Sequence, residues 1–231
     1  MLLNFKDLTI GYRDRVVASA LTAGLTAGKV TCLLGANGIG KSTLLRTLAG
    51  YQAPLEGEMD RVSPETLGVV LTERTDAMGL SVREVVVMGR HPYTGYFGRM
   101  RSEDEQMVEK AMRLTHTEEY ADRAFASLSD GERQKVMIAK ALAQETPIIL
   151  MDEPSAFLDF PSKVQLMLML RELAHRQGKT ILLSTHDVGI ALKTADVLWL
   201  MHKGGMTMGT PQELEMSGCI DAFLGESRAY V

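Results

Sequence analysis

The feature that most constrains this chain is a glycine-rich loop, Gly35–Ser42, set between an apolar run and a helical stretch. The loop matches the pattern G-x-x-x-x-G-K-[ST] at every fixed position. Its glycines permit a tight curl that turns backbone N–H groups inward, where they can hold phosphate oxygens. Val30–Leu34 before the loop is typical of a buried strand, and Thr43–Ala49 after it is typical of a helix that ends at Gly50. The sequence therefore predicts phosphate binding at a helix N-terminus.

Two side chains carry the chemistry of this loop. A lysine in the position of Lys41 reaches the β- and γ-phosphates of a nucleoside triphosphate, and the hydroxyl of Ser42 ligates Mg²⁺. We expect the backbone of the whole loop to hold the nucleotide. The predicted nucleotide-binding residues of this segment are Gly35, Ala36, Asn37, Gly38, Ile39, Gly40, Lys41, Ser42 and Thr43.

Two adjacent carboxylates, Asp152 and Glu153, follow a second short apolar run at Pro147–Met151. Residues at the carboxyl ends of parallel strands face the ligand crevice of such sheets. Asp152 is therefore predicted to hold Mg²⁺, and Glu153 to orient or deprotonate the water that attacks the γ-phosphate. A solvated acidic pair that caps the next turn is the alternative, and the presence of the glycine-rich loop favours the metal and base roles.

Three further segments give the chain a family resemblance. Leu128-Ser-Asp-Gly-Glu132 lies about twenty residues before Asp152, Ser155-Ala-Phe-Leu-Asp159 follows the acidic pair, and His186 follows the apolar run Thr180–Ser184. In this order, and together with the glycine-rich loop, the segments resemble those of ABC-transporter ATPases. The resemblance covers nearly the whole chain and implies that the nucleotide is ATP, bound with Mg²⁺.

The resemblance also implies roles for single residues. His186 would be the switch histidine and act in catalysis with Glu153 and Lys41. The segment Ser155–Asp159 would be the part of the chain that the family calls the D-loop, and Asp159 would bind nucleotide from it. Tyr12 would stack on adenine. The alternatives are a core or capping role for His186 and a plain strand-end aromatic for Tyr12.

The segment Leu128–Glu132, which we call the signature, would contact the γ-phosphate held by another protomer through Ser129 and Gly131. Ser129 also stands where a helix N-cap belongs, so an ordinary capped helix is the alternative. The family pattern is L-S-G-G-Q, and here Asp130 and Glu132 replace glycine and glutamine.

These two replacements add negative charge near a highly anionic ligand. We therefore expect weaker binding unless Arg133, Lys135 or Mg²⁺ offsets the added charges. At another family position, which usually holds a glutamine, this chain has Thr72 with Glu73 beside it. The resemblance therefore implies the same loop in this chain, but not the role that the glutamine has in the family.

The chain has one copy of the glycine-rich loop and one copy of the signature. If both close on the same phosphate, two protomers must hold two nucleotides head to tail. A two-fold homodimer achieves this with one self-complementary interface. ATP would hold the two protomers together, and hydrolysis would release them.

The predicted fold is a single α/β domain over residues 1–231, with a P-loop NTPase core and a mostly parallel sheet. Residues 1 to about 27 alternate in polarity and predict an N-terminal antiparallel β element. Residues 1–80 and 128–231 are expected to form the β-subdomain and RecA-like core. Residues 81–127 are expected to form an inserted helical subdomain.

Composition excludes some functions. The formal net charge of −4 gives no electrostatic reason to expect nucleic-acid binding. Two cysteines in 231 residues suggest reduced thiols and a cytoplasmic setting. We see no signal peptide and no apolar stretch of about 18 residues. Together with the family resemblance, which implies association with membrane subunits, this leads us to expect a cytoplasmic protein that is peripheral on the inner face of the cell membrane.

Two segments resemble a subfamily that drives uptake of iron–siderophore, haem and cobalamin complexes, namely Gly79–Val86 and Gly89–Gly95. The resemblance implies an ATP-hydrolysing importer subunit that works through separate membrane permease subunits and, through them, a substrate-binding protein. The region 81–127 would make the membrane contact, with the aromatic loop Pro92–Phe97 as a candidate docking surface. A soluble non-transport ABC ATPase and an ATP-gated module with little hydrolysis remain as alternatives.

Overall fold

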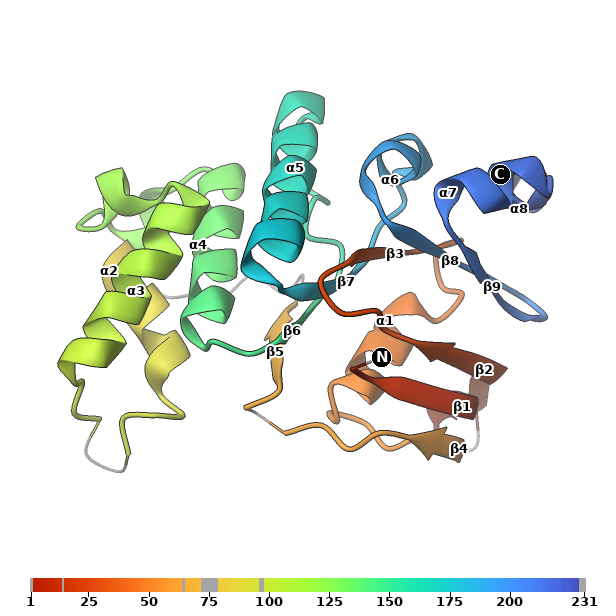
Figure 1. Ribbon diagram of the computed structural model, residues 1–231, viewed down its shortest axis with the longest axis horizontal. Coiled ribbons are helices and arrows are strands. Elements are labelled where there is room, and N and C mark those ends of the chain that lie inside the picture. Colours follow the sequence, from red (N-terminus) through yellow and green to blue (C-terminus); the bar gives the residue numbers. More distant parts are fainter. Residues whose placement is uncertain (1, 14, 64, 72–78, 96–97, 229–231) are drawn as a thin grey trace.

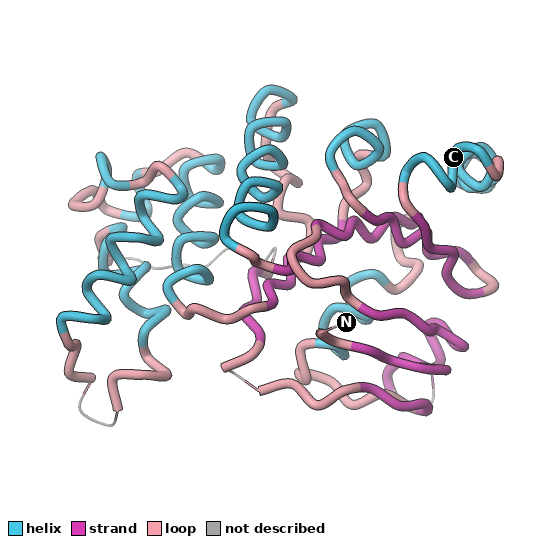
Figure 2. Tube along the Cα trace, in the orientation of Figure 1, coloured by secondary structure: helices cyan, strands magenta, loops and turns pink. Residues whose placement is uncertain are grey.

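The computed structural model describes residues 2–13, 15–63, 65–71, 79–95 and 98–228 (Figures 1 and 2). Thr72, Glu73, Tyr96 and Phe97, which the sequence analysis singled out, lie outside these ranges. No helix of the described residues is long and apolar enough to span a bilayer.

An antiparallel sheet of three strands forms the N-terminal part of the chain. Its strand order is β2-β1-β4, from β1 (Asn4–Tyr12), β2 (Arg15–Gly24) and β4 (Glu56–Met59). The antiparallel element predicted for residues 1–27 is thus present, and β4 extends it from beyond the glycine-rich loop.

A second sheet of six strands is parallel except at one edge. Its order is β5-β6-β7-β3-β8-β9, from β5 (Leu67–Val70), β6 (Ile148–Met151), β7 (Thr180–Ser184), β3 (Val30–Gly35), β8 (Val197–His202) and β9 (Gly205–Gly209). Only β9 runs antiparallel to its neighbour. The predicted mostly parallel sheet is confirmed, and its central strands β6, β7 and β3 are almost wholly buried because helices and the small sheet cover both faces (Figure 1).

Alternation along β3 divides the core in two. Cys32 and Leu34 point into one cluster of buried side chains, and Leu33 between them points into the other. In the second cluster the ring of Trp199 meets Phe5 edge to face, with centroids 5.6 Å apart. This contact joins the small sheet to the large one.

Helices α2 (Val82–Val87), α3 (Ser102–Thr115) and α4 (Asp130–Ala143) form a separate helical layer, at the left of Figure 1. Short 3₁₀ turns lie between them at Met88–Arg90, Glu118–Tyr120 and Phe125–Ser127. The helices lie where the insert was expected, and α4 carries the layer on to Ala143. The domain boundary at 127 stays a prediction.

Five helices accompany the large sheet. They are α1 (Lys41–Leu48), α5 (Phe160–Gln177), α6 (Val188–Thr194), α7 (Pro211–Met216) and α8 (Cys219–Arg228). In Figure 1, α5 stands between the helical layer and the rest of the core, whereas α8 lies at the opposite end of the molecule.

A buried arginine ties the helical layer together. The guanidinium of Arg90 donates to Asp104 Oδ1 at 2.9 Å, to the Ala143 carbonyl at 2.7 Å and to Glu145 Oε2 at 2.7 Å. Its charge also lies 4.1 Å from the ring centre of Tyr93, whose hydroxyl donates to the backbone of the residue after Ala143. Because a buried charge is stable only when it is paired, these contacts fix the 88–93 turn to the C-terminal end of α4.

The neighbouring Gly89 allows this close approach. A Cβ at Gly89 would collide with the Lys140 carbonyl and lie 3.1 Å from Ala143 Cβ. We predict that Gly89→Ala lowers the free energy of unfolding by about 1–3 kcal/mol, the usual cost of overpacking. Gly189→Ala is the control, because nothing lies within 4 Å of its added Cβ. Urea unfolding should leave that control unchanged or slightly stabilised, and equal stabilities for the two variants would contradict the packing argument.

Candidate functional site

The glycine-rich loop connects β3 to α1 and bends where its glycines permit. Gly38 and Gly40 have φ values of +77° and +117°, in the region that favours glycine. A Cβ at Gly40 would also lie 2.6 Å from Val17. At Gly35 a glycine is needed for lack of space, because an added Cβ would lie 2.8 Å from the Ile39 side chain. The loop therefore ends in a helix N-terminus without a side-chain cap, whose backbone N–H groups can donate hydrogen bonds to an anion.

Lys41 lies almost buried at the start of α1, with only 5% of its surface exposed. Its ammonium donates to the carbonyls of Gly35, at 2.9 Å, and Ala36, at 3.2 Å. Burial lowers the pKa of Lys41, and the nearby carboxylates of Glu153 and Asp152 oppose that fall. The lysine thus closes the loop on itself, and a phosphate that enters the loop would offer the ammonium a stronger partner than two carbonyls. Ser42, next in the helix, is exposed and Thr43 is buried.

The acidic pair lies directly after β6. Ser184, at the end of the adjacent strand β7, donates its hydroxyl to Asp152 Oδ1 at 2.7 Å and accepts the N–H of Glu153 at 2.8 Å. Glu153 has a φ of +45°, an unusual conformation for a residue other than glycine. One serine hydroxyl therefore fixes the Asp152 carboxylate and the backbone of Glu153. Ser184 was noted only as part of the strand before His186, because the contact depends on strand pairing that the sequence does not show.

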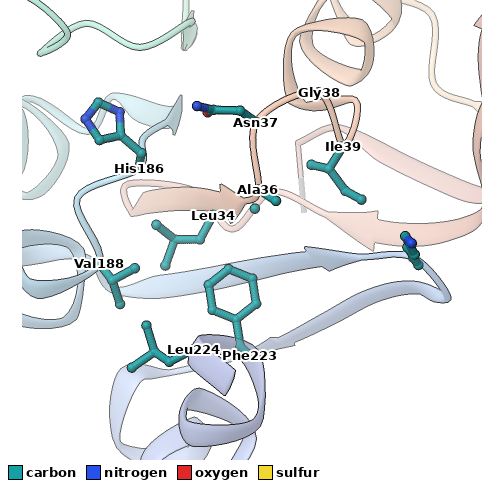
Figure 3. Close-up of a pocket in the computed structure, with 11 residues that line it drawn as sticks. Leu34, Ala36, Asn37, Gly38, Ile39, His186, Val188, Phe223 and Leu224 are labelled. Carbon is teal, nitrogen blue, oxygen red and sulfur yellow. The ribbon is translucent and has the colours of Figure 1, made fainter. Parts of the chain in front are cut away.

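Glu153 lies between two nitrogen-bearing side chains. Its Oε1 is 3.9 Å from the Lys41 ammonium, and its Oε2 is 3.6 Å from His186 Nδ1. Figure 3 shows His186 across from Asn37 of the glycine-rich loop. The structure thus brings the three predicted catalytic residues together. His186 follows β7, which is the fourth strand of the large sheet in chain order.

Tyr12, at the end of β1, lies beside the first turn of α1. Its hydroxyl is 3.4 Å from Thr43 Oγ1, and about half of the residue is exposed. The Gln52 side chain donates to the Gly11 carbonyl and so fixes the backbone just before Tyr12. A hollow of about 720 Å³ opens here, with Tyr12 and Tyr51 in its walls. An aromatic face beside the phosphate loop is suited to stacking on a nucleobase.

The signature lies elsewhere in the chain. Ser129 is the N-cap of α4, and its hydroxyl accepts the Glu132 N–H at 3.3 Å. Figure 1 shows α4 in the helical layer, away from α1, which follows the glycine-rich loop. Gly131, in the first turn of α4, has Leu158 3.6 Å from the position of its would-be Cβ. The D-loop therefore packs against the signature.

Local contacts hold the two acidic replacements in the signature. Asp130 pairs with Arg133 at 3.7 Å, and Glu132 pairs with Arg123 at 3.3 Å. The Glu132 carboxylate also accepts both the N–H and the hydroxyl of Ser129 at 2.8 Å, and these bonds lower its pKa. Among the cations considered from the sequence, Arg133 does lie beside a carboxylate. Arg123 was missed because it lies before the signature and outside its helix.

Asp159 caps α5 at the far end of the D-loop. Its Oδ1 accepts the Ser162 N–H at 3.0 Å, and this bond lowers the pKa of the carboxyl group. In this structure the side chain of Asp159, which was predicted to contact nucleotide, acts as the N-cap of α5. Because the side chain of Asp159 is exposed, it is placed to contact a second molecule at the protein surface.

The residues present fit a nucleoside triphosphate with Mg²⁺. A helix N-terminus with glycines in left-handed conformations offers N–H groups to phosphate, and a buried ammonium stands beside it. A hydroxyl at Ser42 and the buried carboxylate of Asp152 are hard oxygen donors of the kind Mg²⁺ prefers.

Comparisons with known proteins agree with this geometry. The sequence matches the ABC transporter family over residues 19–156. It is 37% identical over 221 residues to the achromobactin transport ATP-binding protein of Dickeya dadantii, covering 90% of this chain and 82% of that protein. It is 35% identical over 235 residues to the ferric enterobactin transport ATP-binding protein of Escherichia coli, covering 96% and 87%. A solved ATP-binding subunit of an ABC transporter superposes with a TM-score of 0.82 at 27% identity, covering 99% of this chain and 100% of that one.

We predict that Lys41→Ala raises the dissociation constant for ATP about tenfold to a hundredfold. A lost charge-assisted hydrogen bond accounts for about 1.5–3 kcal/mol. Isothermal titration calorimetry measures the constant, with Lys6→Ala as a control because Lys6 is exposed on the small sheet. An affinity within about threefold of the wild type would contradict the assignment of this loop.

Proposed function

We propose that this chain, which belongs to the ABC transporter family, hydrolyses ATP to drive an importer whose cargo is an iron–siderophore, haem or cobalamin complex. Family membership makes it an ABC ATPase, in which ATP hydrolysis is coupled to transport. One observation carries the proposal: Lys41, Glu153 and His186 meet at the glycine-rich loop, whereas α4, which begins just after Ser129, belongs to the separate helical layer in Figure 1.

We propose that the site is completed by a second copy of the chain. The loop Gly35–Thr43 would hold the phosphates from one side, and Ser129 and Gly131 of the partner would hold the γ-phosphate from the other. Tyr12 would stack on adenine, and Asp159 would act from the D-loop across the same interface. Two such sites form at once in a two-fold dimer, so ATP binding and dimer formation are linked.

Within this arrangement Glu153 is the proposed base. Its backbone N–H donates to the hydroxyl of Ser184, and its carboxylate lies near His186, which would hold the water or the phosphate end in line. Lys41 would stabilise negative charge on the γ-phosphate as it is transferred. Ser42 and Asp152 would hold Mg²⁺, which supplies positive charge between the phosphates when it is bound.

The cargo and the partners follow from the resemblance and from the relatives. One relative is named for transport of ferric enterobactin, which supports an iron(III) complex as cargo. We propose that the helical region 81–127 docks on membrane permease subunits at the inner face of the membrane, and that a substrate-binding protein delivers cargo to those subunits. Tyr93 in this region is partly exposed, while its hydroxyl and ring are held by α4 and Arg90.

Replacing Glu153 with Gln should stop turnover without loss of ATP binding. The amide keeps the shape of the carboxylate but cannot accept a proton. Phosphate release should fall below a tenth of the wild-type rate, while the ATP dissociation constant stays within about threefold. Glu172→Gln, on the exposed face of α5, is the control and should keep full activity. Substantial hydrolysis by Glu153→Gln would rule out this residue as the base.

Cells that lack this chain should lose uptake of one of the three proposed cargo classes. Uptake of radiolabelled iron–siderophore, haem and cobalamin can be compared in the same deletion strain. The wild-type gene should restore the lost uptake, and the Glu153→Gln form should not. Undiminished uptake of all three would exclude the proposed cargo class, while the ATPase assignment would still stand on the purified protein.

A further inference from the structure

An apolar hollow of about 660 Å³ lies beside the glycine-rich loop. Figure 3 shows the side chains of Leu34, Val188, Phe223 and Leu224 around it, with Asn37 and His186 at one rim. Phe223 and Leu224 come from α8, so the C-terminal helix builds one wall against the end of β3. The volume is in the range of sites that enclose a bulky apolar group.

The chain also carries two exposed aromatic side chains in and just after the D-loop. Phe157 and Phe160 are 58% and 68% exposed, although each is large and apolar. They flank Leu158 and Asp159, and Asp159 fixes the second of them at the first position of α5. Two exposed aromatic residues only three positions apart in the chain are more typical of an interface than of a solvated loop.

The position of this aromatic pair follows from the signature. Leu158 packs against Gly131, at 3.6 Å from the would-be Cβ, so the pair lies close to the N-terminus of α4. In the shared site proposed above, that N-terminus meets the glycine-rich loop of the partner. The aromatic pair must then arrive beside the same loop, where the apolar hollow opens.

We propose that Phe157 and Phe160 of one protomer dock in the apolar hollow of a second copy, against Val188 and Leu224. This inference rests on the proposed ATP-bound dimer and adds an apolar contact to its phosphate contacts. The two-fold axis makes the contact twice, so each substitution counts twice in the dimer.

A second copy suits the hollow better than a membrane partner does. The helical layer proposed to face the membrane and α8 lie at opposite ends of the molecule in Figure 1. The hollow is instead walled by the glycine-rich loop and by His186, which both belong to the nucleotide site. Its occupant must therefore come with the chain that completes that site.

Cross-linking tests the contact directly. All chains carry Glu153→Gln to hold ATP and Cys219→Ser to remove the half-buried thiol near Phe223; Cys32 is fully buried and stays. A chain with Phe157→Cys is mixed with a chain with Leu224→Cys and treated with a short bis-maleimide. We expect a linked heterodimer with ATP and little with ADP. In the control, Leu168→Cys replaces Phe157→Cys. Leu168 is exposed within α5, and its cysteine should give no ATP-dependent product.

Dimer affinity gives a second readout. In the Glu153→Gln background, Phe157→Ala with Phe160→Ala should raise the ATP-dependent dimer dissociation constant at least tenfold, while Leu168→Ala should leave it within twofold. ATP affinity of the monomer should not change. A dimer that forms normally, with no cross-link above the control and no loss of affinity, would overturn this inference and leave the shared site intact. A parent chain that stays monomeric with ATP would overturn both.

Discussion

The buried ammonium of Lys41 is the charge around which the site is arranged. An unpaired cation with 5% exposure would be costly, and here two loop carbonyls and the Glu153 carboxylate surround it. The left-handed glycines bring those carbonyls within reach, and the central position of β3 in the large sheet holds the loop rigidly. A triphosphate would offer the ammonium a stronger partner than these two carbonyls, because the hydrogen bond would then join opposite charges.

Helix α4 connects the signature, which we propose to contact ATP, to the 81–127 region, which we propose to face the membrane. Its 14 residues span about 21 Å, with the Ser129 cap at one end and the Arg90 and Tyr93 contacts at the other. Because Arg90 is buried and fully engaged, the turn at 88–93 must follow any movement of the helix. A displacement of the signature by phosphate would therefore reach the 81–127 region through one rigid element.

Sequence patterns predict the parts of this molecule that depend on neighbours in the chain. The run Val30–Leu34, the glycines of the loop and the Ser129 cap are local signals, and each forms the element that its pattern indicates. The remaining features depend on pairing between distant segments. Ser184 reaches the Asp152 carboxylate and the Glu153 N–H only because β7 lies beside β6, and Arg123 meets Glu132 only after the chain turns before α4. The Arg90 cluster likewise joins three separate stretches and carries no local pattern.

The central claim is that each ATP is held between the loop of one chain and the signature of another. Ser129→Asp tests it most directly, since Asp keeps the N-cap but places a negative charge against the partner's phosphate. Ser129→Asn is the matched neutral cap, and both are made with Glu153→Gln. Analytical ultracentrifugation with ATP should show dimers for the Asn form and monomers for the Asp form, while both monomers bind ATP with equal affinity. Equal dimerisation of the two forms, or loss of monomer ATP binding in the Asp form alone, would contradict the shared site.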